Sequence, residues 1–197
     1  MGNAKNEKRK RREQRAIIEA TEFWHGGAAG REPGDTLLSP LLTHDPTSVS
    51  TTGMPEARAD RVYFTTDREL ARVYASIVQT HAGASAVYRV LPLGELERDP
   101  DYPTVGFQSA KASVLEVVER DVVMSVEERG IRCQPYELYT DGRNVHDETG
   151  RLQLAPGWDL LGFDQKYIDN NFAPWTSYED AGLQLLAASR RSGSHTS

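Results

Sequence analysis

The chain has 197 residues, a net charge of −6 and 38% hydrophobic residues, which is enough for a globular domain with its own core. No stretch approaches the roughly 18 apolar residues that a membrane span needs, and the first residues show no secretion signal. The single cysteine, Cys133, excludes an internal disulfide and a cysteine-based zinc site. These features predict a cytoplasmic protein that does not contact membranes.

The first 15 residues form a basic segment. It holds seven Lys or Arg residues against two Glu, for a net charge of +5, whereas the rest of the chain carries about −11. A block of like charge with almost no apolar residue cannot bury itself. Residues 1–15 are therefore expected to be disordered or a solvated helix. Residues 5–15 are candidates for a contact with nucleic acid or another acidic surface; a solubilising tail is the alternative.

A compact domain is predicted over residues 16–126. Its first strand is expected at Glu22–His25, ending at Gly26-Gly27. Residues 28–60 are rich in turn formers and show little periodicity. A connection of this length within a compact domain is usually functional.

The next segments have clearer patterns. Asp60–Thr66 alternates and is rich in β-formers, which predicts a strand. Asp67 is a plausible N-cap for a helix with apolar residues at three- and four-residue spacing up to Val78. His81-Ala82-Gly83 is expected to close this helix. Two further strands are predicted at Ala86–Leu91 and Ser113–Glu119.

The composition changes after residue 126. Residues 127–189 carry two tryptophans and several tyrosines among polar residues, and they are expected to form a C-terminal extension or covering subdomain. Within it, Glu179–Ser189 is predicted to be a helix. Residues 190–197 are expected to be a disordered tail.

Three polar residues stand where predicted strands end: His25, Tyr63 and Asp99. Each has an ordinary structural explanation, as a turn residue, a core residue with an exposed hydroxyl, and a turn former before Pro100. Their combination favours an enzyme, because functional groups concentrate at the ends of regular elements.

The chain resembles the rifamycin-inactivating ADP-ribosyltransferases over residues 21–121. Members of that family are small enzymes that use a His-Tyr-Asp set in place of the His-Tyr-Glu set of diphtheria-toxin-like transferases. The segments that carry the resemblance are His25-Gly26-Gly27, Val62–Thr66, the helix from Asp67 to Val78, Val87–Pro92, Arg98-Asp99-Pro100 and Ser113–Glu119.

The resemblance implies an α+β fold with a split β core. In such a core, two small antiparallel sheets surround a cleft that binds NAD, here with a few helices and a C-terminal extension added. By analogy, His25 would hydrogen-bond the ribose next to adenine, and Tyr63 would lay its ring against the nicotinamide. Asp99 would lie near the nicotinamide-side ribose or near the acceptor.

Four further residues are expected to help bind NAD. Gly26 and Gly27 lack the Cβ that would keep a ligand from the backbone, and Thr65 could touch the cofactor or cap the helix. Arg89 could pair with the pyrophosphate, since guanidinium matches phosphate bidentately, although a plain surface charge is an equal alternative. The histidines lack metal-ligand spacing, so no metal site is predicted.

These residue types suit the chemistry that the resemblance implies. When the nicotinamide–ribose bond breaks, the sugar gains positive charge that a fixed carboxylate stabilises. The same carboxylate can take the proton of an attacking nucleophile. An aromatic face attracts the positively charged nicotinamide by about 0.5–2 kcal/mol.

The expected function is therefore mono-ADP-ribosylation with NAD as the ADP-ribose donor. Residues 101–109 are shorter than the corresponding family segment and lack its arginine, and residues 127–197 and the basic start are additions. These departures favour a protein or nucleic-acid acceptor over rifamycin, as in a toxin or phage-borne effector acting in a bacterial cell or phage-infected host. Two alternatives are a non-catalytic interaction or virion-associated protein that contacts nucleic acid through its basic start, and an NAD glycohydrolase.

Overall fold

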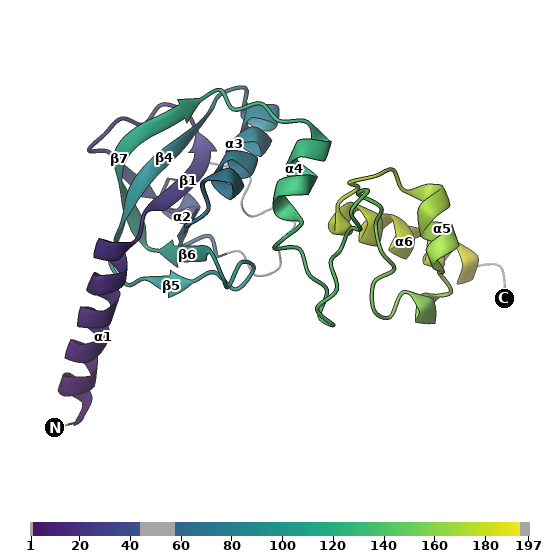
Figure 1. Cartoon of the computed structure of the whole chain (residues 1–197), viewed down its shortest axis with the longest axis horizontal. Coiled ribbons are helices and arrows are strands. Elements are labelled where there is room, and N and C mark those ends of the chain that lie inside the picture. The colour runs from purple at the N-terminus through teal and green to yellow at the C-terminus, as the bar shows by residue number, and fades with distance from the viewer. Residues whose placement is uncertain (1, 44–57, 194–197) are drawn as a thin grey trace. The chain divides into compact units, whose positions relative to one another are not determined.

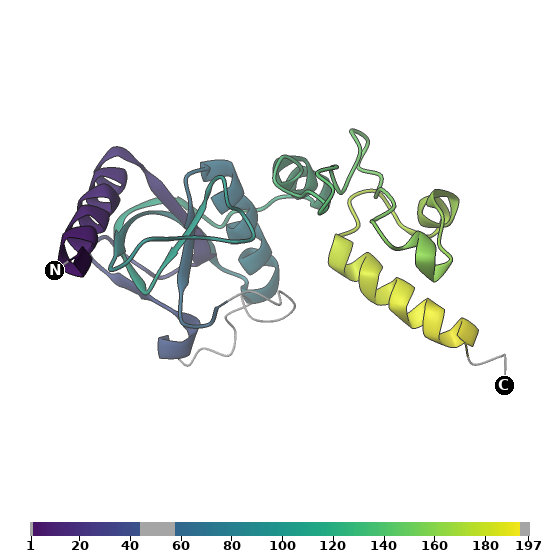
Figure 2. The same ribbon diagram turned by 90° about the horizontal axis from the view of Figure 1, so that it is seen from below.

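The computed structural model describes residues 2–43 and 58–193. The chain divides into two compact units, Met1–Val123 and Met124–Ser197, drawn in Figures 1 and 2. The boundary at Val123 lies close to the one expected after residue 126. Among the described residues, no helix combines the length and the apolar character that crossing a membrane requires.

The first unit is α+β, and its described residues form one antiparallel sheet of seven strands. The order across the sheet is β2-β7-β4-β1-β3-β6-β5. The strands are β1 (Phe23–Ala28), β2 (Thr36–Leu38), β3 (Val62–Thr65), β4 (Ser85–Leu93), β5 (Glu97–Arg98), β6 (Gly106–Ser109) and β7 (Lys111–Arg120).

A single residue pair, Trp24 with Thr65, joins the two halves of this sheet. On one side of it, β1 pairs with β4 along its whole length, and on the other, β3 pairs with β6. The expectation of two separate small sheets is therefore corrected: the strands form one hydrogen-bonded sheet, in which β1 and β3 stop pairing beyond Trp24.

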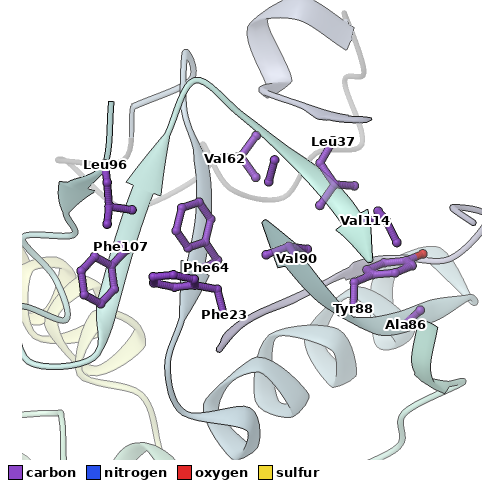
Figure 3. Packing of buried hydrophobic residues seen from close by; sticks show 11 residues of the cluster. Phe23, Leu37, Val62, Phe64, Ala86, Tyr88, Val90, Leu96, Phe107 and Val114 are labelled. Atoms are coloured by element: carbon purple, nitrogen blue, oxygen red, sulfur yellow. The ribbon is translucent and has the colours of Figure 1, made fainter. Parts of the chain in front are cut away.

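An aromatic cluster forms the core between the two halves (Figure 3). The ring of Phe23 meets those of Phe64 and Phe107 edge-on, at centroid distances of 5.4 and 5.3 Å. Tyr88 and Val90 of β4 belong to the same buried cluster. The edge-to-face arrangement is a favourable one for aromatic rings. Side-chain packing of Phe23 therefore connects β1 with β3 and β6, where β1 and β3 share only one backbone pair.

Helix α3 (Arg68–Ala82) follows β3 and begins and ends as the sequence predicts. The Asp67 carboxylate accepts a hydrogen bond from the Glu69 N–H at 2.8 Å, which confirms the predicted N-cap. Gly83, at φ 74°, closes the helix in the left-handed region. Ala71 and Ala75 of α3 pack with Val87 of β4, so the small side chains of the helix let it lie close to the sheet.

Three details of the sequence prediction differ from the structure. Strand β1 does not stop at Gly26-Gly27 but continues to Ala28, because both glycines keep their pairing with β4. The long connection after it contains β2 and α2 (Pro40–Thr43), and its residues 44–57 lie outside the described part of the chain. Strand β6 was not predicted, and β5 was expected only as a strand that ends at Asp99, without bounds.

The basic start is helical: α1 spans Gly2–Ala20. Of the two states that the sequence left open, the structure shows the solvated helix. Lys10 pairs with Glu95, and the Gln14 amide donates to the backbone oxygen of Leu96 at 3.0 Å. The Lys10–Glu95 pair is largely exposed and adds little, so the Gln14 bond and the packing of Ile18 hold the second half of α1 against the first unit.

The second unit is mostly helical, with a core that includes Trp158, Ile168 and Leu185. The predicted helix at Glu179–Ser189 is confirmed as part of α6, shown along its length in Figure 2. Because α6 continues to Gly193, the disordered tail predicted from residue 190 is wrong for residues 190–193, and residues 194–197 lie outside the described part. The elements are α4 (Val126–Cys133), the 3-10 helix η2 (Asp159–Leu161), α5 (Gln165–Asn171) and α6 (Tyr178–Gly193).

Candidate functional site

His25 lies on β1 directly after the pair that joins the two halves of the sheet. Its Nδ1 is 2.7 Å from the backbone oxygen of Tyr63. A carbonyl oxygen can only accept, so Nδ1 carries the hydrogen and Nε2 of the neutral ring is an acceptor. Burial lowers the pKa of His25, which the Tyr63 carbonyl offsets only in part. The imidazole is therefore neutral at pH 7.

Both glycines after His25 have a packing role within the protein. A Cβ on Gly26 would lie 1.8 Å from the backbone oxygen of Ala71 in α3. A Cβ on Gly27 would lie 2.6 Å from His25 Nε2. Gly26 thus lets helix α3 approach β1, and Gly27 leaves room for the imidazole over the strand. The sequence had assigned both glycines to the approach of a cofactor.

Tyr63 lies inside β3 and His25 inside β1, so the expectation that both stand at strand ends is wrong. Tyr63 pairs in register with Gln108 of β6. Its hydroxyl oxygen accepts a hydrogen bond from the Arg58 backbone N–H. Burial is the main cause that raises the pKa of Tyr63, and the charges of Asp99 and Asp101 add to it. Since those carboxylates act on the phenol, Tyr63 and Asp99 belong to one electrostatic environment.

Asp99 directly follows β5 and is 7% exposed. Its N–H donates to the Gly106 carbonyl at 3.1 Å, and its Oδ1 accepts from the Asp101 N–H at 3.0 Å. Burial raises the pKa of Asp99 to about 6, against the opposing effect of the Asp101 N–H. A carboxyl group that titrates this close to neutrality is typical of acid–base sites.

The sheet register shows which of the predicted residues come together. Thr65 pairs with Gly106, and the backbone bond from Asp99 extends that row across the sheet. Tyr63 lies two residues from Thr65, so its side chain and that of Asp99 project from the same face. His25 follows Trp24, which pairs with Thr65, so its side chain starts from the opposite face of the sheet. The structure therefore does not place all three predicted side chains on one face, and the link that it shows for His25 is the bond to the Tyr63 backbone oxygen.

Tyr102, which the sequence did not place in the site, lies beside Asp99, and Tyr74 packs against Tyr102. A Cβ on Gly106 would be 2.8 Å from the Cβ atoms of both Asp99 and Tyr102. The Tyr102 ring in turn meets the ring of Tyr74, from α3, edge-on at 6.1 Å. The buried carboxylate therefore has an aromatic neighbour, whose only sequence signal is its position after Asp99-Pro100.

Gln108 is a further residue that the sequence did not single out. It is 5% exposed, and its Nε2 donates to the Arg98 carbonyl at 3.2 Å. Its Oε1 is buried and has no hydrogen-bond partner among the described residues. Buried polar atoms normally have a hydrogen-bond partner. The Gln108 Oε1 atom, on the residue that pairs with Tyr63, is therefore an acceptor that a ligand could use.

Thr65 and Arg89 are engaged elsewhere. The Thr65 hydroxyl accepts from the Asp67 N–H at 3.0 Å, which places it at the start of α3. Arg89 pairs with Glu116 of β7 at 3.2 Å. Strands β1, β3 and β6 separate Arg89 from Asp99, so the structure does not bring this guanidinium beside the carboxylate.

A cavity of about 270 Å³ lies where α1 meets β1 and β4. Ile18, Thr21, Arg89 and Leu115 are among its lining residues, but His25, Tyr63 and Asp99 are not. The three predicted site residues therefore lie outside this cavity. Within residues 2–43 and 58–193, no group of three or more His, Cys, Asp or Glu side chains could hold a metal ion.

We refer to Tyr63, Asp99 and Tyr102 with the neighbouring His25 as the candidate site. It offers a buried carboxylate that titrates near pH 6, aromatic rings and a neutral imidazole with one acceptor nitrogen. Such a set can stabilise a positive charge, accept a proton and stack against a flat cation. No protein-family model and no curated protein matches the chain.

Proposed function

We propose that the chain is a mono-ADP-ribosyltransferase whose single seven-stranded sheet is a joined form of the ADP-ribosyltransferase-like core. It would transfer ADP-ribose from NAD to a macromolecular acceptor. The observation that supports this best is the buried Asp99, with its pKa at about 6, on the same face as Tyr63 and beside Tyr102. The near-separation of the sheet at the Trp24–Thr65 pair is compatible with such a core.

Asp99 is the catalytic residue of this proposal. With a pKa of about 6, it is mostly ionised at pH 7. The bond between ribose C1′ and the nicotinamide nitrogen breaks, and its electron pair leaves with nicotinamide. The carboxylate stabilises the positive charge that this leaves on the ribose. The acceptor's nucleophilic atom then bonds to C1′, and its proton passes to Asp99.

The tyrosines and His25 would hold NAD in position. The pyridinium ring of NAD is flat and cationic, which suits stacking on Tyr63 or Tyr102. His25 Nε2 can accept a hydrogen bond from a ribose hydroxyl, because Nδ1 is already committed to the Tyr63 carbonyl. A neutral imidazole orients the ribose next to adenine without adding positive charge to the site.

The acceptor is proposed to be protein or nucleic acid. Two additions to the sheet support this: the helix α1, rich in basic residues, and the separate unit Met124–Ser197. A small antibiotic needs neither of them.

The loop between Asp99 and Gly106 folds back on itself, with the Gly106 N–H bonded to the Tyr102 carbonyl at 2.6 Å.

The test is transfer of label from NAD. The full chain is incubated with adenine-labelled NAD and, in separate reactions, a bacterial lysate, purified nucleic acid and rifamycin. We expect labelled macromolecule with the wild type and its loss with Asp99→Asn, by about 10²-fold or more. Asp159→Asn makes the same chemical change at an exposed residue of the second unit and should leave transfer intact.

Three results would contradict the proposal in different ways. Release of free ADP-ribose without labelled macromolecule would assign NAD hydrolysis instead of transfer. If the chain neither binds NAD nor turns it over, the result would favour a non-catalytic protein. Equal activity of the wild type and Asp99→Asn would remove Asp99 from the chemistry.

A further inference from the structure

Helix α1 presents two different faces. Lys10, Gln14 and Ile18 lie at i, i+4 and i+8, on one side of the helix. Lys10 pairs with Glu95, and Gln14 bonds to the Leu96 carbonyl. Ile18 packs against the aromatic core of the first unit. This face attaches α1 to the sheet.

The second face carries positive charge and nothing apolar. Lys8, Arg11, Arg12 and Arg15 lie at i, i+3, i+4 and i+7, which aligns them along one side of the helix. All four are exposed. They span about 10 Å of helix axis. We call these four residues the basic face.

The remainder of the chain does not share this charge. Residues 1–15 carry +5 and the rest about −11. Arg15 pairs with Glu19 within the helix, but both side chains are largely exposed, and such pairs contribute little and exchange readily. The basic face therefore gives α1 a local positive charge on an acidic protein, and its acidic neighbour Glu19 lies at the end next to Arg15.

We propose that the basic face of α1 binds the phosphate backbone of nucleic acid. Three of its four residues are arginine, whose planar guanidinium matches a phosphate bidentately. Because helical spacing aligns the four charges, they can meet several phosphates of one backbone at once. The proposal concerns binding alone and does not depend on NAD chemistry at Asp99.

Two other occupants fit the basic face less well. A helix that lies on a membrane needs an apolar face to insert, and Ile18 is already packed against the core. Protein interfaces are dominated by aromatic and other well-buried anchors at their centre, and the basic face has none. A purely ionic surface suits a polyanion with regularly spaced charges.

Binding is measured by fluorescence anisotropy with the full chain and no NAD. The probes are an RNA duplex, a DNA duplex of the same sequence, a single strand, and polyglutamate as an acidic polypeptide. Salt is varied between about 50 and 200 mM. Contact with four phosphates of a duplex should make log K fall against log salt with a slope of about −4.

Two double variants distinguish the basic face from general charge. Arg11→Gln/Arg12→Gln should reduce affinity at least tenfold and make the slope less steep by about 2. Lys166→Gln/Arg190→Gln removes the same charge from exposed positions of α5 and α6 and should bind as the wild type does. Glutamine has a helix propensity close to that of arginine, so α1 is retained, which circular dichroism checks.

The relative affinities of the RNA and DNA probes assign the nucleic acid. The proposal is overturned by absence of binding to every nucleic-acid probe, by equal affinities of the two double variants, or by tighter binding of polyglutamate than of nucleic acid. Asp99→Asn must bind as the wild type does. Loss of transfer with retained binding therefore bears only on the proposed function.

Discussion

The His25 imidazole donates a hydrogen bond from Nδ1 to the Tyr63 backbone oxygen at 2.7 Å, directly beyond the single pair that joins the two halves of the sheet. The side chain thus replaces a backbone bond at the point where β1 and β3 cease to pair. It satisfies the Tyr63 carbonyl and sets the tautomer of the ring. A structural bond and a candidate ligand-binding atom therefore reside on the same imidazole.

Gly26→Ala should destabilise the first unit. The new methyl would lie 1.8 Å from the Ala71 carbonyl oxygen, a backbone atom that can move only with helix α3. Overpacking of this kind costs about 1–3 kcal/mol or more, measured as the free energy of unfolding in urea. Gly182→Ala is the matched control, because its added Cβ has no described neighbour within 4 Å beyond the adjacent residues and the backbone of its own helix. In a helix this change should be neutral or stabilising. Equal effects of the two substitutions would contradict the close packing of α3 on β1.

Gly27→Ala should affect His25 more than the stability of the fold. Its methyl would meet His25 Nε2 at 2.6 Å, and the imidazole is a side chain that can turn away. We expect a smaller loss of unfolding free energy than for Gly26→Ala, together with weaker NAD binding in calorimetry. A variant that loses stability as Gly26→Ala does, yet binds NAD as the wild type does, would show that the imidazole is not the group displaced.

Asp99→Asn should stabilise the folded protein at neutral pH. The pKa of Asp99 is about 6, against 3.8 for the ordinary group, because burial disfavours its charge. The folded state therefore binds the proton more tightly, and ionising the group above pH 6 costs about 3 kcal/mol. Asparagine keeps an Oδ1 acceptor for the Asp101 N–H and avoids that cost.

The sign of this effect gives the pH dependence. Relative to Asp99→Asn, the wild type should lose stability as the pH rises from about 4 to 6, and the difference should stay constant above that range. Urea unfolding of both variants at about pH 4, 5, 6 and 8 measures it. A wild type that gains stability over Asp99→Asn as the pH rises would contradict a pKa raised by burial.

The sequence predicted the elements whose signals are local. Asp67 caps α3 through its own carboxylate, and Gly83 ends the helix through its own positive φ. The alternation around Val62 and Phe64 belongs to a strand whose inner side chains reach the aromatic core. In each case residues close together in the sequence determine the element, so the pattern predicts it without knowledge of the rest of the fold.

Elements defined by distant partners were predicted incompletely or not at all. Strand β5 is two residues long and exists only through its pairing with β6. The continuation of β1 through Gly26 depends on β4, and the closeness of α3 accounts for that glycine. The joining of both halves into one sheet rests on Trp24 and Thr65, which are far apart in sequence.

The candidate site shows the same difference between local features, which the sequence predicts, and features that depend on the fold. The sequence identified Asp99 as a residue type, but its raised pKa comes from burial, and the loop that ends at Gly106 folds against it. Tyr102 is identified as a site residue only because that loop places it beside Asp99. Arg89, chosen because guanidinium suits phosphate, is separated from Asp99 by three strands and pairs with Glu116.

The second unit should be more stable in mild acid through His146. This residue is 3% exposed, and its Nε2 donates to the Thr176 carbonyl at 2.8 Å, while Nδ1 lies 3.5 Å from a Glu137 carboxylate oxygen. Burial acts to lower the pKa of His146, but Glu137 and the Thr176 carbonyl outweigh it, so the net pKa is raised. The resulting stabilisation is complete below the unfolded-state pKa, near 6.5, and is lost as the pH rises through the higher folded-state value.

Urea unfolding of Trp24→Phe measures this effect, because Trp158 and Trp175 then report only on the second unit. The same measurement on Trp24→Phe/Glu137→Gln removes the carboxylate that pairs with His146. We expect the advantage of the protein that retains Glu137 to be larger at about pH 5.5 than at about pH 8.5, since only the protonated imidazole forms the charged pair. An advantage that is constant across this range, or that grows with pH, would show that His146 does not take up its proton beside Glu137.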